Sequence, residues 1–97
     1  MSGIEIPVLS IPKVALVTGG NSGIGRATAA RLAAMGSAVV VGYNSRRAQA
    51  EEVAGCLEGC GHLAIRIAID DPASVSVAAA TVDQQYGRLD ALVNCGG

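Results

Sequence analysis

Four short apolar segments recur along the chain, and segments with helical spacing of their apolar residues separate them. The first two are aliphatic runs typical of strands buried on both faces, and the third alternates large with smaller or charged side chains. The predicted strands are 13–18, 38–41, 63–69 and 89–94. The predicted helices are 23–35, 45–58 and 72–86.

Residues at the ends of the predicted helices support these boundaries. Asp71 is expected to cap the third helix, which begins with Pro72, and Gly87 follows its last residue. Ser45 is expected to cap the second helix. The residues expected on the buried face of the first helix are Ile24, Thr28, Leu32 and Met35.

The alternation of strands and helices predicts one α/β domain with a parallel sheet, because right-handed crossovers join successive strands. Residues 1–12 contain two prolines and no regular period, so we expect an N-terminal tail followed by a domain over residues 13–97. The chain stops directly after a predicted buried strand. Because natural sheets protect such an edge, we expect the sequence to be part of a longer protein.

Composition excludes several classes of protein. Of the 97 residues, 51% are hydrophobic and 15% are charged, which rules out intrinsic disorder. The net charge of −1 lacks the basic excess of nucleic-acid-binding proteins. No apolar run approaches the ~20 residues that cross a membrane, and the first residues lack the features of an export signal. We therefore expect a cytoplasmic protein whose three cysteines are reduced.

The most informative segment is the glycine-rich turn after the first predicted strand. Gly19 allows a tight turn, Gly23 leaves room for a diphosphate, and Gly25 lets the helix approach the sheet. The free N–H groups at the start of that helix, with the positive end of its dipole, then face the anion. A mononucleotide phosphate loop is excluded, because Arg26 and Ala27 occupy positions that require Lys and Ser or Thr.

Two separated motifs resemble those of the short-chain dehydrogenase/reductase family. The turn T-G-G-N-S-G-I-G at residues 18–25 resembles the family's cofactor signature, and G-R-L-D-A-L-V-N-C-G-G at residues 87–97 resembles its G-R-L-D-x-L-V-N-N-A-G segment. The resemblance implies a Rossmann-like, doubly wound parallel sheet, truncated here after its fourth strand. It also implies an oxidoreductase that binds NAD or NADP and moves a hydride between the nicotinamide and a small-molecule carbonyl or alcohol substrate.

The resemblance further implies which residues contact the cofactor. The residues that it places around the diphosphate and the adenosine ribose are Gly19, Asn21, Ser22, Gly23, Ile24 and Gly25. Asn94 would hold the fourth strand through its side chain, and Gly96 would line the cofactor cleft with its backbone. Ala68 stands where the family has an adenine-contacting Asp, so Ile69 and Asp70 are the expected adenine contacts.

The turn after the second predicted strand indicates which dinucleotide binds. An acidic residue there would hydrogen-bond the ribose 2′-OH of NAD and repel the 2′-phosphate of NADP, but no carboxylate occurs before Glu51. The turn contains Tyr43, Asn44, Ser45, Arg46 and Arg47 instead. Cations at a helix N-terminus oppose its dipole unless an anion binds, so we interpret this turn as a phosphate cradle, with two solvated arginines as the alternative. The sequence therefore favours NADP over NAD.

The catalytic residues that the resemblance implies are absent from these 97 residues. The family uses a Tyr-x-x-x-Lys pair with an upstream Ser, and neither Tyr43 nor Tyr86 is followed by Lys four residues later. We therefore expect the chain alone to be inactive. The resemblance implies that the longer protein is a homo-oligomer that acts on a carbonyl or an alcohol.

Other interpretations of the same residues are a non-catalytic dinucleotide-sensing or scaffold protein, and a methyltransferase that binds an adenosyl cofactor on a similar sheet. Cys56 and Cys60, even with His62, offer too few ligands for a metal site. Cys95 replaces the second Asn of the family's terminal segment, and a thiol cannot make the two-sided hydrogen bonds of an amide. No neighbouring histidine supports Cys95 as a nucleophile.

Overall fold

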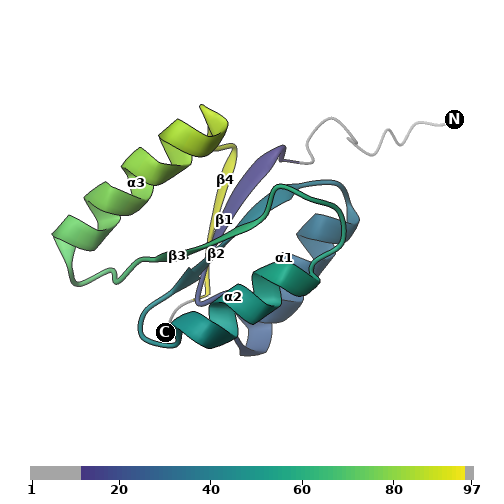
Figure 1. Ribbon diagram of the computed structural model, residues 1–97, viewed down its shortest axis with the longest axis horizontal. Helices are drawn as coiled ribbons and strands as arrows, with labels where there is room; N and C mark the ends of the chain where they lie inside the picture. Colours follow the sequence, from purple (N-terminus) through teal and green to yellow (C-terminus); the bar gives the residue numbers. More distant parts are fainter. Residues whose placement is uncertain (1–11, 96–97) are drawn as a thin grey trace, which may run out of the picture.

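The computed structural model describes residues 12–95, which form a four-stranded sheet with helices on both faces (Figure 1). The elements are β1 (Val14–Thr18), α1 (Gly23–Ala34), β2 (Ala38–Tyr43), α2 (Arg47–Cys56), β3 (Leu63–Arg66), α3 (Pro72–Tyr86) and β4 (Ala91–Asn94). The strand pairs are parallel in the order β3-β2-β1-β4, so the predicted Rossmann-like sheet is confirmed. Apart from Pro12, the predicted tail lies outside the described residues, as does Gly96.

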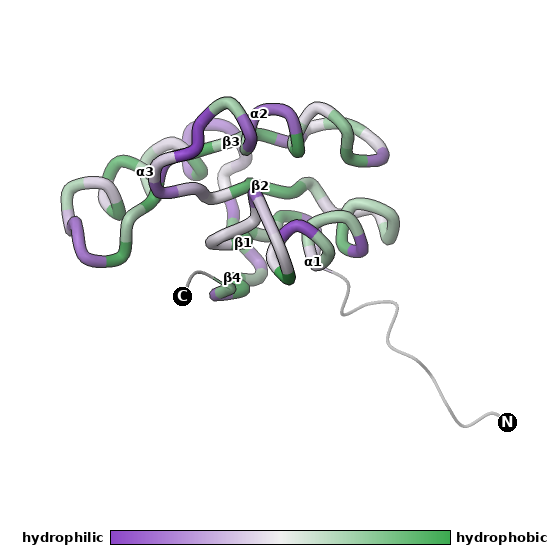
Figure 2. The backbone as a smooth tube through the Cα atoms, turned by 90° about the horizontal axis from the view of Figure 1, so that it is seen from below, coloured by the Kyte–Doolittle hydropathy of each residue, from purple (hydrophilic) through white to green (hydrophobic). Residues whose placement is uncertain are grey.

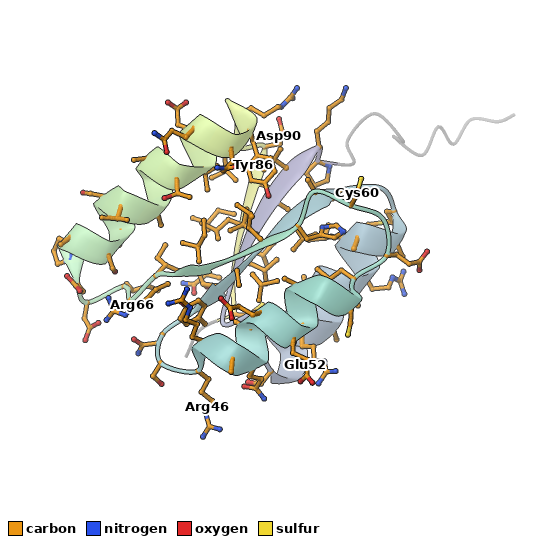
Figure 3. The ribbon with its side chains drawn as sticks, in the orientation of Figure 1. Arg46, Glu52, Cys60, Arg66, Tyr86 and Asp90 are labelled. Carbon is orange, nitrogen blue, oxygen red and sulfur yellow. The ribbon has the colours of Figure 1, made fainter. Side chains whose placement is uncertain are left out.

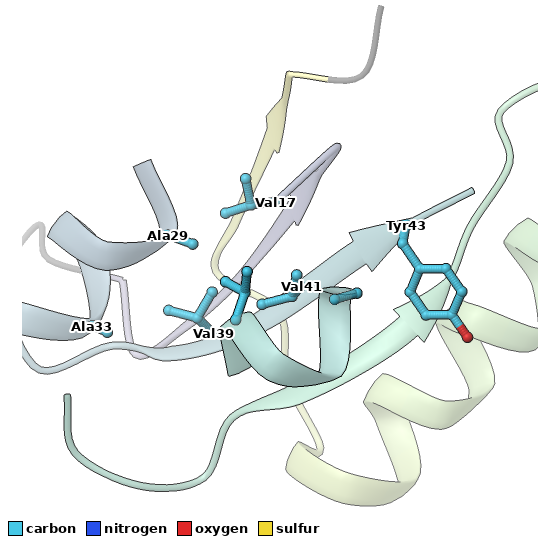
Figure 4. Packing of buried hydrophobic residues seen from close by; sticks show 8 residues of the cluster. Val17, Ala29, Ala33, Val39, Val41 and Tyr43 are labelled. Carbon is cyan, nitrogen blue, oxygen red and sulfur yellow. The ribbon is translucent and has the colours of Figure 1, made fainter. Parts of the chain in front are cut away.

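The sheet separates two apolar layers, because neighbouring residues of a strand point to opposite faces. Val39, Val41 and Tyr43 pack with residues of α1 and α2, whereas Val40 packs with Ala78 of α3. Figure 2 shows the strands between α3 on one side and α1 and α2 on the other, and Figure 4 shows the first layer from close by. Within residues 12–95, no helix has both the length and the apolar character needed to span a bilayer.

The strand order changes direction at β1. From β1 the chain proceeds through α1 to β2 and β3 on one side, and α3 then carries it back to β4 on the other side. At such a switch point the connections leave the carboxyl ends of the strands in opposite directions, which opens a crevice between them. The topology therefore directs attention to the carboxyl end of β1 and of its neighbours in the sheet.

The buried face of α1 differs from the predicted one. Ile24 is 79% exposed and Met35, just beyond the helix, is 45% exposed, while Gly25, Ala29 and Ala33 are buried. The prediction is wrong for Ile24 and Met35, because close packing of a helix on a sheet selects small side chains, and these also recur here at helical spacing. The prediction holds for Leu32, which is partly buried and packs against the core. The helix thus lies near the backbone of the sheet rather than on a layer of large side chains.

The helix ends confirm one predicted cap and contradict another. The side chain of Asp71 accepts a hydrogen bond from the backbone N–H of Ala73 at 3.2 Å, and Gly87 ends α3 with a φ of 70°. Helix α2, in contrast, begins two residues after Ser45, and its N-cap, Arg46, makes no side-chain capping bond. Ser45 instead belongs to an exposed turn between β2 and α2.

Strands β3 and β4 are shorter than predicted, and β2 is longer. The backbone N–H of Ile67 still donates to the carbonyl of Tyr43 at 2.8 Å, but the chain leaves the sheet after that bond. The third predicted strand therefore ends early, and Ile69 lies outside the sheet with 62% of its surface exposed.

Asp90 joins the start of β1 to the segment before β4. Its carboxylate accepts hydrogen bonds from the backbone N–H groups of Lys13 at 3.1 Å and Val14 at 3.0 Å, and from the Arg88 guanidinium at 2.6 Å. The Arg88 bond, followed by the Val14 bond, holds the pKa of Asp90 below its usual value. The folded state therefore favours the ionised carboxylate.

We expect this carboxylate to give the folded chain an acid-sensitive stability. Because the pKa is lowered on folding, the contribution is fully present above the unfolded value, about 3.9, and is lost as the pH falls through the folded value. Asp90→Asn should lower the free energy of unfolding at neutral pH. In acid, the free energy of unfolding of this variant should decrease less with falling pH than that of the original chain. Urea titrations from about pH 7 to about pH 2 measure this, with Asp83→Asn on the exposed surface of α3 as the control. If the free energy of unfolding of Asp90→Asn decreases in acid as steeply as that of the original chain, Asp90 does not make this contribution.

Candidate functional site

A cleft of about 560 Å³ lies at the carboxyl ends of β1, β2 and β3. Its walls come from the turn after each of these strands. The residues that line it are Thr18, Gly19, Asn21, Ser22, Asn44, Ser45, Arg46, Ile67, Ala68, Ile69 and Asp70. Most of the residues predicted to contact a cofactor are thus brought to one place from three separate turns.

The glycine turn after β1 is shaped by backbone geometry that favours glycine. Gly19 and Gly23 have φ values of 65° and 60°, in the left-handed region. A Cβ built on Gly25 would lie 2.1 Å from the carbonyl oxygen of Gly19, so α1 packs directly on the turn. A Cβ on Gly23 would meet nothing within 4 Å, which means that the space beside it is open. The predicted roles of the tight turn and the close helix approach agree with this geometry.

The N-terminus of α1 carries backbone donors that no protein group satisfies in the described part of the chain. Its N-cap, Ser22, is extended and makes no side-chain capping bond, and the first turn contains no acidic residue. The first hydrogen bond within the helix runs from the N–H of Arg26 to the carbonyl of Ser22 at 3.3 Å. The N–H groups of Gly23, Ile24 and Gly25 are therefore available, together with the positive end of the helix dipole, to an anion.

Asn21 links the glycine turn to α2. Its side-chain amide donates to Oε1 of Gln49 at 2.8 Å, and both residues are partly buried. Gln49 has no signal in the sequence, because a glutamine in a helix is ordinarily a surface residue. The bond links the glycine turn to α2, the helix that follows the turn after β2 (residues 44–46, the β2 turn).

Tyr43 does not contribute to the cleft, contrary to prediction. It is 8% exposed, and it packs in the layer beneath α2 (Figure 4). As the last residue of β2 it points to the same face as Val39 and Val41, which explains its burial. The cleft is instead lined by the three exposed residues that follow, Asn44, Ser45 and Arg46.

The two arginines after β2 differ in their surroundings. Arg47 makes an ion pair with Glu51 at 3.1 Å, and this hydrogen-bonded carboxylate raises the pKa of Arg47. Arg46 has no carboxylate partner among residues 12–95, and Figure 3 shows its side chain extending away from the helices. Arg46 is therefore the cation at this turn whose charge is not matched by a protein group.

The third wall of the cleft lies beyond β3. Ala68 is buried, and its backbone N–H and carbonyl are both hydrogen-bonded to the hydroxyl of Ser74, at 2.9 and 3.0 Å. These bonds turn the chain so that Ile69 and Asp70 reach the cleft, as the adenine-contact prediction requires. The exposed Ile69 offers an apolar surface, and Asp70 offers a carboxylate.

Asn94 lies at the end of β4, outside the cleft. Its Oδ1 accepts a hydrogen bond from the hydroxyl of Thr18 at 2.8 Å, and that hydroxyl accepts one from the backbone N–H of Cys95 at 3.1 Å. Asn94 thus connects the ends of β1 and β4, in line with the predicted role of its side chain. It also borders an apolar groove between α3 and these two strands.

The cysteines do not form a metal site in the described residues. Helix α2 ends at Cys56, so the exposed Cys60 lies beyond it rather than one turn away on the same helix. Across residues 12–95, no three His, Cys, Asp or Glu side chains come together as metal ligands would. The nitrogens of His62 contact the backbone, at Val39 and Glu58.

Comparison with known proteins shows which family the chain belongs to. The family model described as short chain dehydrogenase matches residues 13–97. An uncharacterized oxidoreductase of Methylorubrum extorquens is 46% identical over 89 residues, which cover 88% of this chain and 35% of that protein. The short-chain reductase protein NovJ of Streptomyces niveus is 42% identical over 91 residues, covering 92% of this chain and 34% of its own. The chain therefore spans about a third of the length of these relatives.

A solved structure shows the same fold. The crystal structure of 3-ketoacyl-(acyl-carrier-protein) reductase from Brucella melitensis, complexed with NADH, superposes with a TM-score of 0.76 at 39% identity. The match covers 82% of this chain and 32% of that one. Since the family model covers nearly the whole sequence, the chain belongs to the short-chain dehydrogenase family.

Proposed function

We propose that this chain forms the adenosine- and diphosphate-binding part of an oxidoreductase that uses NADP(H) in preference to NAD(H). The observation that carries the proposal is the N-terminus of α1, whose free N–H groups stand beside a cleft with no side chain at Gly23. Membership of an oxidoreductase family supports the nucleotide chemistry. In the longer protein, a hydride would pass between the nicotinamide and a carbonyl or alcohol substrate.

The residues present fit one half of a dinucleotide. The diphosphate would accept hydrogen bonds from the amides of Gly23, Ile24 and Gly25, and the adenine would lie against Ile69. The cofactor would supply the hydride, and these residues would bind and orient it. The described residues include no Tyr-x-x-x-Lys pair, so we propose that the chain alone does not turn over a carbonyl substrate.

The preference for NADP follows from the charges around the β2 turn. No carboxylate stands in residues 43–46, where one would bind the 2′-OH of NAD, and the charge of Arg46 is unmatched within the described residues. A guanidinium group forms strong, charge-assisted hydrogen bonds with phosphate. We also propose a cytoplasmic location, which the free cysteines support, and a homo-oligomeric longer protein, which the family resemblance implies.

Calorimetry on the 97-residue chain with fragments of the cofactor tests the proposal. ADP-ribose is the part of NAD that these residues would bind. The compound 2′-phospho-ADP-ribose carries in addition the 2′-phosphate that distinguishes NADP from NAD. We expect both to bind, the phosphorylated one about tenfold more tightly, and S-adenosylmethionine not to bind. Equal affinity for the two would reject the NADP preference. If neither binds, the proposed function is wrong. If the purified chain oxidises NADPH with a carbonyl compound, the proposal that the chain alone is inactive is wrong.

A further inference from the structure

Arg66 lies where the sheet ends and the turn that lines the cleft begins. It is the last residue of β3, in register with Tyr43, the last residue of β2. Its Nε donates a hydrogen bond to the carbonyl oxygen of Asn44 at 3.2 Å. This side-chain bond adds one more link between the ends of β3 and β2, beside the backbone hydrogen bonds that pair the two strands.

The guanidinium of Arg66 is itself held by α3. Its Nη1 contacts Oδ2 of Asp71 at 3.3 Å, while Oδ1 of Asp71 accepts the N–H of Ala73 at the start of the helix. Asp71 is thus fixed by its capping role, and Arg66 spans from that cap to the β2 turn. In Figure 3, Arg66 lies beside this turn, while Arg46 lies on its far side, at the start of α2.

The β2 turn has little other support. In the part of the chain that the structure describes, no other side chain hydrogen-bonds to residues 44–46, and Arg46 lacks a capping bond. Asn44, Ser45 and Arg46 are all exposed. The position of the Asn44 carbonyl, and with it the course of the chain to Arg46, therefore depends on the Arg66 side chain.

We infer that Arg66 is a positioning residue for cofactor specificity: it holds the Asn44 carbonyl so that Arg46 reaches the ribose 2′-phosphate. This inference rests on the proposed function. Arg66 does not line the cleft, and its charge is matched by Asp71, so it acts through the turn rather than on the phosphate. The group that performs this role is the Nε–H donor, rather than the positive charge of the guanidinium.

Three substitutions separate the donor from the charge. In Arg66→Gln the amide nitrogen occupies the same place along the side chain as Nε, without a charge. Arg66→Met has a carbon there, and Arg66→Lys has a carbon there but keeps the charge. Arg31→Met, an exposed arginine on α1 away from the cleft, is the matched control.

The measurement is calorimetric binding of ADP-ribose and 2′-phospho-ADP-ribose to each variant, with a thermal melt of each. We expect Arg66→Met and Arg66→Lys to bind the phosphorylated ligand about fivefold more weakly, with less than about a twofold change for ADP-ribose. Arg66→Gln and Arg31→Met should resemble the original chain.

Each other outcome overturns the inference. If Lys preserves the selectivity and Gln loses it, Arg66 acts by its charge. If both ligands weaken equally while the melting temperature falls, its role is structural only. If the original chain prefers the phosphorylated ligand and Arg66→Met binds both ligands as the original chain does, the inference is rejected. The proposed function then stands. An original chain that binds neither ligand, or both equally, rejects the NADP proposal and the inference with it.

Discussion

Gly25→Ala should lower the free energy of unfolding by about 3 kcal/mol or more. The added methyl group would lie 2.1 Å from the carbonyl oxygen and 2.6 Å from the carbonyl carbon of Gly19, both of them backbone atoms. No side-chain rotation relieves such a contact, so α1 must move away from the glycine turn. The helix N-terminus would move with it, and binding of ADP-ribose should be lost as well. Urea unfolding and calorimetry measure the two effects.

Gly55→Ala is the matched control, because Gly55 lies inside α2 and a Cβ there would meet nothing within 4 Å. Alanine is the better helix former, so this change should stabilise the chain by about 0.5–1 kcal/mol. If Gly25→Ala behaves like Gly55→Ala, then α1 does not pack on the turn as described. The assignment of its N-terminus to a diphosphate would then lose its geometric basis.

Arg46→Asp should weaken the binding of 2′-phospho-ADP-ribose by about 100-fold, which corresponds to about 2.7 kcal/mol, and that of ADP-ribose by no more than about twofold. The substitution removes a charge-assisted hydrogen bond and places a negative charge near the phosphate. It should not harm folding, since aspartate is a favourable N-cap and its charge suits the N-terminus of α2. The same change in the longer protein should affect NADPH far more than NADH.

The control for this prediction is Arg31→Asp, which makes the same change of charge on an exposed position of α1 outside the cleft. It allows for the general effect of a more negative chain on an anionic ligand. Equal losses for the two ligands in Arg46→Asp, or equal effects of the two substitutions, would show that Arg46 does not contact the 2′-phosphate.

Short-range signals in the sequence were sufficient to predict the order of strands and helices and the parallel sheet. Buried parallel strands are recognisable as aliphatic runs, and Asp71 with Pro72 specifies a helix start by its own capping chemistry. The glycine turn was predictable for a similar reason, since Gly19 and Gly23 occupy backbone conformations that other residues rarely adopt. These features depend on neighbours within a few residues.

Features that depend on distant residues were not predictable. The position of Tyr43 after the predicted strand 38–41 places it in the cleft, but the strand continues to Tyr43 and its pleat turns that side chain into the core. The bond between Asn21 and Gln49 joins residues 28 positions apart, and the bond from Arg66 to Asn44 joins residues 22 apart. Neither partner pair has a motif, because any polar side chain of suitable length could occupy those positions.

The proposed function requires that the amide groups at the start of α1 bind a diphosphate. Amide NMR spectra of the ¹⁵N-labelled chain, recorded during a titration with ADP-ribose, test it most directly. We expect the largest shifts at the N–H groups of Gly23, Ile24 and Gly25, because these helix-start donors follow directly on Ser22, which lines the cleft. Shifts that centre on the start of α3 or on the apolar groove beside β4, with these three amides unmoved, would contradict it.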